Sequence, residues 1–295
     1  MLNTVPLFVV GTAQFGLNYG INNLIGKPTQ EDVFEIVSLA IKKGYSFFDT
    51  AQAYGDSELV LGNAIKRLGV KPAIMSKLLP TINPVDHDLI LDSIKQSCSR
   101  LNVDSLWALK LHRASWLNKW NLGLGDTLKQ AKSEGLISHI GVSIYDYEEG
   151  EMALDCKDIE IIQCPFNAWD PTLLNHNFFQ RAKDQNVMVF CRSIYLQGAL
   201  LLSSKKIIQK LPQAEKISKK WDQLSKEWKI SRLELSYRYV KSFNLPMIIG
   251  IESLDQLHSN LKLADLDPFS DNEIQYLQSQ CHPFSNKNIV NPSLW

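Results

Sequence analysis

Four side chains in the first 112 residues have the types needed for proton transfer. Each lies at the end of a short apolar segment or in the turn that follows one: Asp49, Tyr54, Lys77 and His112. The ordinary pKa of tyrosine, near 10, makes it a poor acid at neutral pH, but a neighbouring ammonium group lowers that pKa. The residue types therefore predict Tyr54 as a proton donor, Lys77 as the group that lowers its pKa, Asp49 as the anchor of Lys77, and His112 as the group that orients a carbonyl oxygen.

Each of these residues also has a structural interpretation. Asp49 could cap the turn that follows it, and Tyr54 could pack on the surface. Lys77 could be an ordinary lysine at the end of a strand, or the Schiff-base lysine of an aldolase. A lone histidine such as His112 is commonly a satisfied side chain under a loop. The four residues become a stronger candidate for a catalytic site if the fold brings them together.

Short apolar segments alternate with amphipathic segments of helical length along the chain. The predicted strands are residues 7–10, 47–48, 73–76, 105–111, 137–142, 159–164, 187–190 and 247–249. The predicted helices are residues 30–43, 57–68, 86–101, 118–135, 147–155, 173–185, 212–243 with a break at 229–232, and 253–263. Eight strand–helix units predict an α/β fold, a single-domain (β/α)8 TIM barrel, whose strand ends converge on one mouth. No glycine-rich dinucleotide fingerprint follows any predicted strand, which argues against a Rossmann domain.

Composition indicates an ordinary globular protein. The 31 basic and 31 acidic residues balance, so no overall charge favours nucleic acid or an anionic membrane. The N-terminal segment lacks a basic leader, and no apolar run has the length of a membrane span. The five cysteines are widely spaced without a C-x-x-C pair, so we expect a cytoplasmic protein with no disulfide framework and no metal site. We expect one domain over residues 1–295, a tail at 281–295 near the barrel mouth, and a monomer or weak homo-oligomer.

The segment FFDTAQAYGDSELVLG resembles the signature of the aldo-keto reductase family. The residues in register with that signature are Asp49, Tyr54, Gly55, Ser57, Glu58 and Gly62. Further similar segments are Ser76-Lys77-Leu78, Leu111-His112, Gly141-Val142-Ser143, Gln163 with Asn167, Ser193 with Gln197-Gly198-Ala199-Leu200, and Gly250, Ser253, Gln256 and Asn260. The opening GTAQFGLNYG resembles that of a bacterial subgroup of the family. The likeness extends from Gly11 to about Leu263.

The resemblance implies an NADP-dependent oxidoreductase that reduces an aldehyde or ketone to an alcohol, with Tyr54 as the proton donor and NAD as a further possible cofactor. Residues implied in cofactor binding are Gly11, Thr12, Asp49, Ser143, Gln163, Arg192, Ser193, Gln197, Gly198, Gly250, Ser253, Gln256 and Asn260. Three positions depart from the family pattern. Ile144 replaces an asparagine, Arg192 replaces an aromatic side chain that stacks on the nicotinamide, and Glu252 with Gln256 replace basic residues near the adenosine 2′-phosphate. Lys205, Lys206 and Lys262 are candidates to supply the missing charge.

The substrate is expected to be a small carbonyl compound, with a sugar as one candidate because aromatic and amide side chains gather in the predicted loops. Predicted substrate-binding residues are Tyr19, Tyr54, His112, Trp116 and Trp169, with Phe15 and Trp295 as further candidate walls of the site. Two alternatives stay open at this point. One is a cofactor-binding, redox-sensing or regulatory barrel with little turnover, and the other is an aldolase that uses Lys77.

Overall fold

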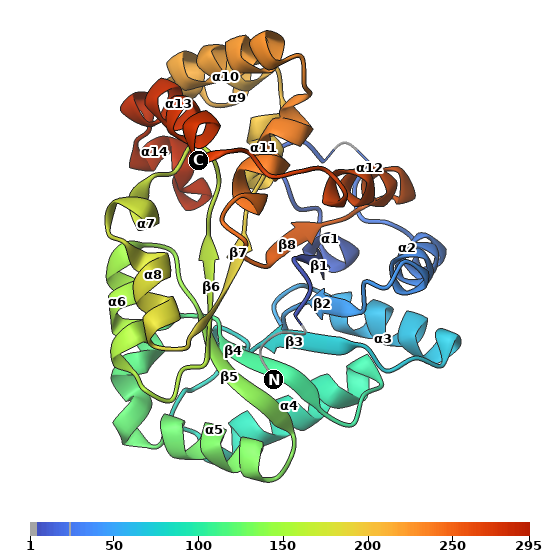
Figure 1. The fold of residues 1–295 in the computed structure, drawn as a ribbon. Helices are drawn as coiled ribbons and strands as arrows, with labels where there is room; N and C mark the ends of the chain where they lie inside the picture. The colour runs from blue at the N-terminus through green and yellow to red at the C-terminus, as the bar shows by residue number, and fades with distance from the viewer. Residues whose placement is uncertain (1–4, 24) are drawn as a thin grey trace.

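The computed structural model of the 295-residue chain describes residues 5–23 and 25–295. Its eight parallel strands close into a barrel in sequence order, with β1 hydrogen-bonded to β8 (Figure 1). The strands are β1 (Phe8–Gly11), β2 (Phe47–Asp49), β3 (Ala73–Lys77), β4 (Leu106–Leu111), β5 (Ile137–Ser143), β6 (Ile161–Pro165), β7 (Met188–Arg192) and β8 (Met247–Gly250). The prediction of a (β/α)8 barrel is confirmed.

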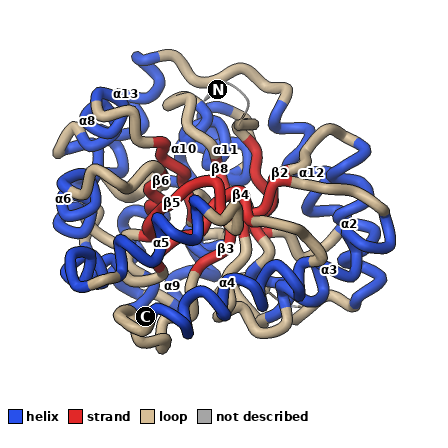
Figure 2. Tube along the Cα trace, turned by 90° about the horizontal axis from the view of Figure 1, so that it is seen from below, coloured by secondary structure: helices blue, strands red, loops and turns tan. Residues whose placement is uncertain are grey.

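Helices surround the strands, as the view turned by 90° from that of Figure 1 shows (Figure 2). The longer ones are α2 (Gln30–Lys42), α3 (Ser57–Leu68), α4 (His87–Leu101), α5 (Leu124–Ser133), α6 (Tyr147–Asp155), α8 (Phe178–Asp184), α9 (Ser204–Lys210), α10 (Glu215–Trp228), α11 (Arg232–Lys241), α12 (Leu254–Ala264) and α13 (Asp271–Cys281). Short helical turns are α1 (Ala13–Gly16), η2 (Ala114–Leu122), α7 (Thr172–Asn175), η3 (Leu196–Leu201), η4 (Pro212–Ala214), η5 (His282–Phe284), α14 (Lys287–Val290) and η6 (Pro292–Leu294).

Local chemistry accounts for most helix boundaries. Helix α2 starts at a capping box in which the Thr29 hydroxyl accepts from the Asp32 amide and the Asp32 carboxylate accepts from the Thr29 amide. Helix α3 ends at Gly69, whose φ of 65° lies in the left-handed region that glycine adopts without a Cβ penalty. Lys229 has a φ of 56° between α10 and α11, which accounts for the break predicted at 229–232.

Two predicted helices are divided in the structure. The segment 118–135 becomes η2 and α5, separated at Gly123, whose φ is 110°. The segment 173–185 becomes α7 and α8, and Asn177 between them has a φ of 53°. In both cases the apolar spacing was compatible with one helix, but a residue in the left-handed region interrupts the helical hydrogen bonds.

The hydrophobic core has two parts. One lies between the barrel and the surrounding helices. The other fills the barrel interior with one apolar side chain from most strands: Val9, Met75, Ala108, Ile161, Phe190 and Ile248. Because side chains alternate along a strand, the residue two positions later on each strand also faces the interior. These later positions form the next layer, which is polar and lies toward the mouth.

The predicted position of the tail at 281–295 near the barrel mouth stays a prediction. Residues after Cys281 pack beside α10, α13 and η4, and the Gln213 amide donates to the Asn288 carbonyl at 3.2 Å. None of the described residues after Asn260 lines the main cavity. In the part of the chain that the structure describes, no helix is both long enough and apolar enough to cross a membrane.

Glu58 joins α3 to β3 and α4 through a buried carboxylate. It is 2% exposed and accepts hydrogen bonds from Ser76 (2.6 Å), Ser97 (3.2 Å) and Arg100 (2.6 and 2.8 Å). Since Glu58→Ala leaves these donors without their acceptor, we expect it to lower the free energy of unfolding by about 2–4 kcal/mol. Urea denaturation measures the change. Glu35→Ala, on the exposed face of α2, is the matched control and should change stability by less than about 0.5 kcal/mol. A loss in Glu58→Ala no larger than in the control would contradict this role.

Candidate active site

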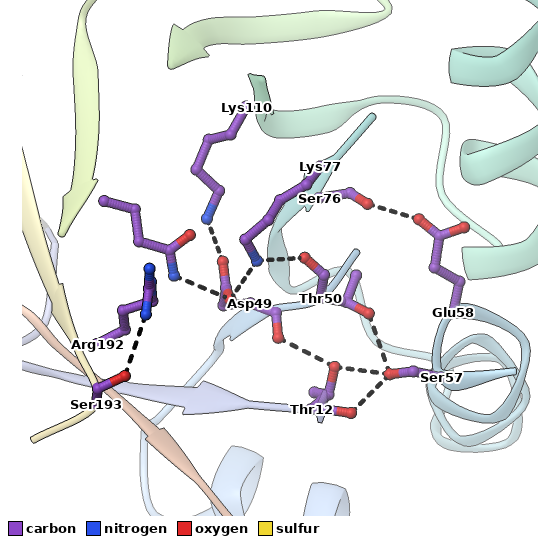
Figure 3. A network of polar contacts seen from close by, with 11 residues as sticks. Thr12, Asp49, Thr50, Ser57, Glu58, Ser76, Lys77, Lys110, Arg192 and Ser193 are labelled. Carbon is purple, nitrogen blue, oxygen red and sulfur yellow. Dashed lines mark hydrogen bonds and ion pairs between the residues drawn. The ribbon is translucent and has the colours of Figure 1, made fainter. Parts of the chain in front are cut away.

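The polar layer of the barrel interior contains two of the four predicted catalytic residues, Asp49 and Lys77. Asp49, Lys77 and Gln163 lie on β2, β3 and β6, each two positions after an interior residue of its strand. Lys110 occupies the same layer on β4, and Arg192 does so on β7. Figure 3 shows Lys77 and Lys110 reaching Asp49 from separate strands, with Arg192 beside Ser193. The alternation of side chains thus accounts for how residues distant in sequence meet at one point.

Asp49 is the hydrogen-bonding centre of this layer. Its Oδ2 accepts from the Lys77 ammonium at 2.8 Å and from the Gln163 amide at 3.2 Å, and its Oδ1 accepts from the Lys110 ammonium. Lys77 also donates to the Thr50 carbonyl at 2.9 Å. Burial opposes the ionised form of Asp49, but Lys110 and Lys77 outweigh that effect and hold the pKa of the carboxyl below its usual value. Asp49 is therefore ionised and fixes the position of Lys77.

The loop after β2 carries Tyr54 and is fastened to the loop after β1. The Thr12 hydroxyl donates to the Asp49 carbonyl at 3.0 Å, and Ser57 Oγ donates to the Thr12 carbonyl at 2.8 Å. Gly16 packs directly on this loop, because a Cβ at that position would lie 1.8 Å from the Tyr54 carbonyl oxygen. The phenol ring lies 4.8 Å from the Lys77 ammonium and 6.2 Å from the His112 ring, measured between ring centroids for the histidine.

Both Tyr54 and His112 are held in their neutral forms. Burial and the charge of Asp49 raise the pKa of Tyr54, and Arg192 only partly offsets them. Desolvation is the largest effect, so the pKa of Tyr54 is raised overall, and the expectation that Lys77 favours the phenolate stays a prediction. Burial and the positive charge of Lys77 lower the pKa of His112 to about 4. A neutral phenol still carries the proton that a donor needs, and a neutral imidazole still forms hydrogen bonds.

The four residues border one cavity of about 500 Å³ at the carboxyl ends of the strands. Predicted residues that line it are Gly11, Thr12, Tyr19, Asp49, Tyr54, Lys77, His112, Ser143, Gln163, Arg192, Ser193, Gln197, Gly198, Gly250, Gln256 and Asn260. The structure also adds Gln14, Tyr145, Tyr195, Glu252 and Asp255, among others, to this lining. Loops after strands are hard to assign from sequence because their path depends on contacts with other loops.

Near the catalytic residues, the cavity presents amide and hydroxyl groups. Gln163 donates to Asp49 through Nε2, while its buried Oε1 has no partner among the described residues. Arg192 donates to the Ile144 carbonyl at 3.1 Å and to Ser193 Oγ at 3.2 Å, and its guanidinium lies 4.5 Å from the centre of the Tyr145 ring. This end therefore offers an unsatisfied acceptor and a flat cation.

The far end of the cavity, near the start of α12, is acidic. Glu252 accepts from Gln256 Nε2 at 2.7 Å and lines the wall together with Asp255. Among the described residues that line the cavity, the cationic side chains are Lys77 and Arg192, and both lie at the catalytic end. Lys205, Lys206 and Lys262 are absent from that lining. Gln197 and Gly198 bend the intervening wall with φ values of 53° and 91°.

Three predicted binding residues do not line the cavity. The Ser253 hydroxyl accepts from the Gln256 amide at 3.2 Å and caps α12 instead. Trp169 is completely buried and packs edge-to-face on Trp221, with 6.3 Å between ring centroids. Trp116 is 7% exposed and belongs to the core outside the barrel. Both tryptophans pack in the core. The position of a tryptophan in the sequence does not distinguish such packing from contact with a ligand.

Lys110 is the main residue that the sequence analysis missed. A signal for it was present: in the strand LWALKLH, Lys110 lies two positions before His112, so it faces the barrel interior. A lysine at such a position needs a buried partner, and Asp49 supplies it.

Comparison with known proteins agrees with the fold. Residues 8–281 match the sequence profile of the Aldo/keto reductase family. "Protein REDOX 2" of Catharanthus roseus is 27% identical over 81% of this chain and 77% of its own length. The D-arabinose 1-dehydrogenase of Saccharomyces cerevisiae is 22% identical over 98% of this chain and 91% of its own. Among solved structures, an aldo/keto reductase from Klebsiella pneumoniae in complex with NADP and acetate superimposes with a TM-score of 0.74, at 19% identity, over 97% of this chain and 95% of that one.

The closed barrel gives the fold class, and the matched family gives the class of protein, an oxidoreductase. The chain belongs to the aldo/keto reductase family, whose members carry out NAD(P)H-dependent carbonyl reduction.

The neutral state of His112 is directly measurable. We expect its ring nitrogens to show the shifts of a neutral imidazole at pH 6 and to titrate near pH 4 in long-range ¹H–¹⁵N spectra. Since the folded pKa lies below the unfolded value of about 6.5, His112 stabilises the fold above that pH, and this stabilisation is lost as the pH falls through 4. His258, exposed on α12, is the internal reference. Titration of His112 at or above pH 6.5 would contradict its desolvation.

Proposed function

We propose that this chain reduces an aldehyde or ketone to an alcohol with NAD(P)H, and that Tyr54 donates the proton to the carbonyl oxygen. One observation carries the proposal: Tyr54, Lys77 and His112 border the same end of the cavity, with Asp49 holding Lys77 from below. These side chains come from the ends of three neighbouring strands and the loops after them. Their types and neutral or ionised states suit proton donation to a polarised oxygen.

The cavity residues fit a nicotinamide dinucleotide. The unpartnered Oε1 of Gln163 is an acceptor for a carboxamide group, and Ser143 lies beside it in register on β5. The Arg192 guanidinium is a flat group that can stack on an aromatic ring. Gln197 and Gly198 would border the diphosphate, and Gln256 and Asn260 the adenosine. When bound, such a cofactor supplies hydride to the carbonyl carbon.

Residues of the protein hold the proton and donate it. The neutral Tyr54 phenol holds it until the carbonyl oxygen gains negative charge. Lys77, 4.8 Å from the ring, stabilises the phenolate that then forms, and Asp49 keeps the ammonium at that place. His112 remains neutral and can hold the carbonyl oxygen by a hydrogen bond without competing for the proton.

We further propose a sugar or related polyol as substrate. Tyr19, Asn22, Asn23, Tyr145 and Gln197 line the cavity, so hydroxyl, amide and aromatic groups are all available to it. Sugar hydroxyls form hydrogen bonds with such amides while their C–H faces pack on aromatic rings. The names of two relatives, D-arabinose 1-dehydrogenase and L-galactose dehydrogenase, refer to sugars.

The prediction of NADP from the family resemblance stays a prediction. Glu252 and Asp255 at the far end of the cavity disfavour a 2′-phosphate and suit a free ribose hydroxyl. Burial raises the pKa of Glu252, which weakens this repulsion but leaves no cation in its place among the described lining residues. We therefore expect NADH to bind at least as tightly as NADPH.

Tyr54→Phe removes the proposed proton donor without changing the shape of the ring. We expect carbonyl reduction to fall by about 10²–10⁴-fold while the affinity for NAD(P)H stays within about twofold. Cofactor oxidation with a panel of aldehydes and keto sugars, and fluorescence quenching, measure the two quantities. Tyr276→Phe on α13 is the matched control and should retain normal turnover. Normal turnover by Tyr54→Phe would refute Tyr54 as the proton donor. Activity of the wild-type protein on apolar aldehydes alone would refute the sugar proposal. Cofactor binding without any turnover would favour a regulatory protein.

Glu252→Lys tests the charge at the far end of the cavity. Because it replaces a negative group by a positive one, we expect the affinity for NADPH relative to NADH to rise on the order of tenfold at low ionic strength, and less at high salt. Glu252→Gln, which removes the charge only, should give an intermediate ratio. Fluorescence quenching titrations with both cofactors measure it, and an unchanged ratio in both variants would show that the 2′ position lies elsewhere.

A further inference from the structure

Lys110 places a second cation beneath the active site. It is 0% exposed and lies in the barrel interior on β4, two positions before His112. It is not among the described residues that line the cavity, so neither cofactor nor substrate would touch it. Its ammonium nonetheless bonds the same carboxylate that holds Lys77.

The barrel leaves space for this side chain. Gly141 on β5 is the register partner of Lys110, and a Cβ at Gly141 would lie 3.0 Å from Lys110 Cγ. The same Cβ would lie 2.8 Å from the Ile161 carbonyl oxygen. Glycine on β5 therefore allows the aliphatic part of Lys110 to cross the interior and reach Asp49.

One carboxylate cannot neutralise two ammonium groups. Lys77 bonds Oδ2 of Asp49 and Lys110 bonds Oδ1, so the buried cluster carries an excess positive charge when both lysines are protonated. Burial lowers the pKa of Lys77 and lowers that of Lys110 to about 7. Lys110 therefore changes charge within the ordinary working range of an enzyme.

We propose that Lys110 is a positioning residue that, through Asp49, sets the electrostatic field at Lys77 and Tyr54 during proton transfer. This inference rests on the proposed carbonyl reduction by Tyr54. Asp49 opposes formation of a phenolate at Tyr54 because the two are like charges. When Lys110 is protonated it offsets Asp49, so Tyr54 is the stronger acid. When Lys110 is neutral its amine can still donate to Asp49, but it no longer offsets the negative charge of that carboxylate, so Tyr54 is the weaker acid.

Other charged and titratable groups around Lys110 come from several strands of the barrel. The Asp49 carboxylate on β2 bonds Lys110 directly and also bonds Lys77 on β3. Arg192 on β7 adds positive charge. His139 on β5, ion-paired with Glu160, lies two positions before Gly141. His112 follows on the same strand and is neutral above about pH 5 because its pKa is about 4. Of these, Asp49 opposes the loss of the Lys110 proton, whereas Lys77 and Arg192 favour it.

The pH profile of carbonyl reduction tests the proposal. With wild-type protein, we expect kcat to rise on the order of tenfold as the pH falls through about 7. Lys110→Met keeps the chain length without the charge, and should give a flat profile at the level of the wild-type high-pH rate, with KM for the carbonyl little changed. Lys110→Arg keeps a permanent charge and should give a flat profile at the wild-type low-pH rate. Lys71→Met, which removes an exposed lysine of a surface ion pair, is the control and should keep the wild-type profile.

Several outcomes would overturn the proposal. One is a step near pH 7 that persists in Lys110→Met, and another is an equal loss of rate at every pH in both variants of Lys110, which would indicate a purely structural role. A third is a wild-type profile without any step in this range.

A spectroscopic measurement separates this proposal from the proposed function. In protein labelled with ¹³C at lysine Cε and tyrosine Cζ, the Lys110 signal, assigned by its loss in Lys110→Met, should titrate near pH 7, and the Tyr54 signal should shift with it. In Lys110→Met the Tyr54 shift near pH 7 should disappear. A Tyr54 signal that ignores this titration overturns the coupling even if the protein reduces carbonyls. Coupling in a protein that reduces none would instead count against the proposed function alone.

Discussion

The buried carboxylate of Asp49 is the constraint on which the barrel mouth depends. It accepts hydrogen bonds from two lysines and a glutamine that belong to three other strands. Removing a carboxylate of this kind would leave two ammonium groups in the interior without a counter-charge, which is far more costly than the net value of the ion pairs. The same carboxylate thus fixes Lys77, contributes to the charge state of Lys110, and raises the pKa of Tyr54.

Tyr54 depends on a second constraint, which is steric. The loop that carries it lies so close to the loop after β1 that Gly16 has no space for a side chain, and Gly55 adopts a φ of 57° beside it. Hydrogen bonds from Thr12 and Ser57 close the same contact. A rigid position for Tyr54 matters because proton transfer requires the donor within hydrogen-bond distance of the reacting oxygen.

The two ends of the cavity differ in charge. Lys77 and Arg192 make the catalytic end positive, whereas Glu252 and Asp255 make the far end negative. Solved structures at 17–21% identity share the barrel with this chain, and a shared fold does not by itself determine such a difference in charge. The fold alone therefore does not determine which cofactor and substrate the cavity prefers.

The sequence by itself determined the order of elements and the identity of the central chemical groups. Eight apolar segments alternating with amphipathic ones predicted the barrel, because strand and helix periodicity are local properties. The signature around Asp49 and Tyr54 predicted the residues that border the cavity with Lys77 and His112. Tertiary structure decided what depends on distant neighbours. It assigned Trp169 to the core, brought Lys110 to Asp49 over Gly141, and made the pKa of Tyr54 rise where a neighbouring lysine alone would lower it. Burial and contacts across strands are properties of the assembled barrel, and no short stretch of sequence encodes them.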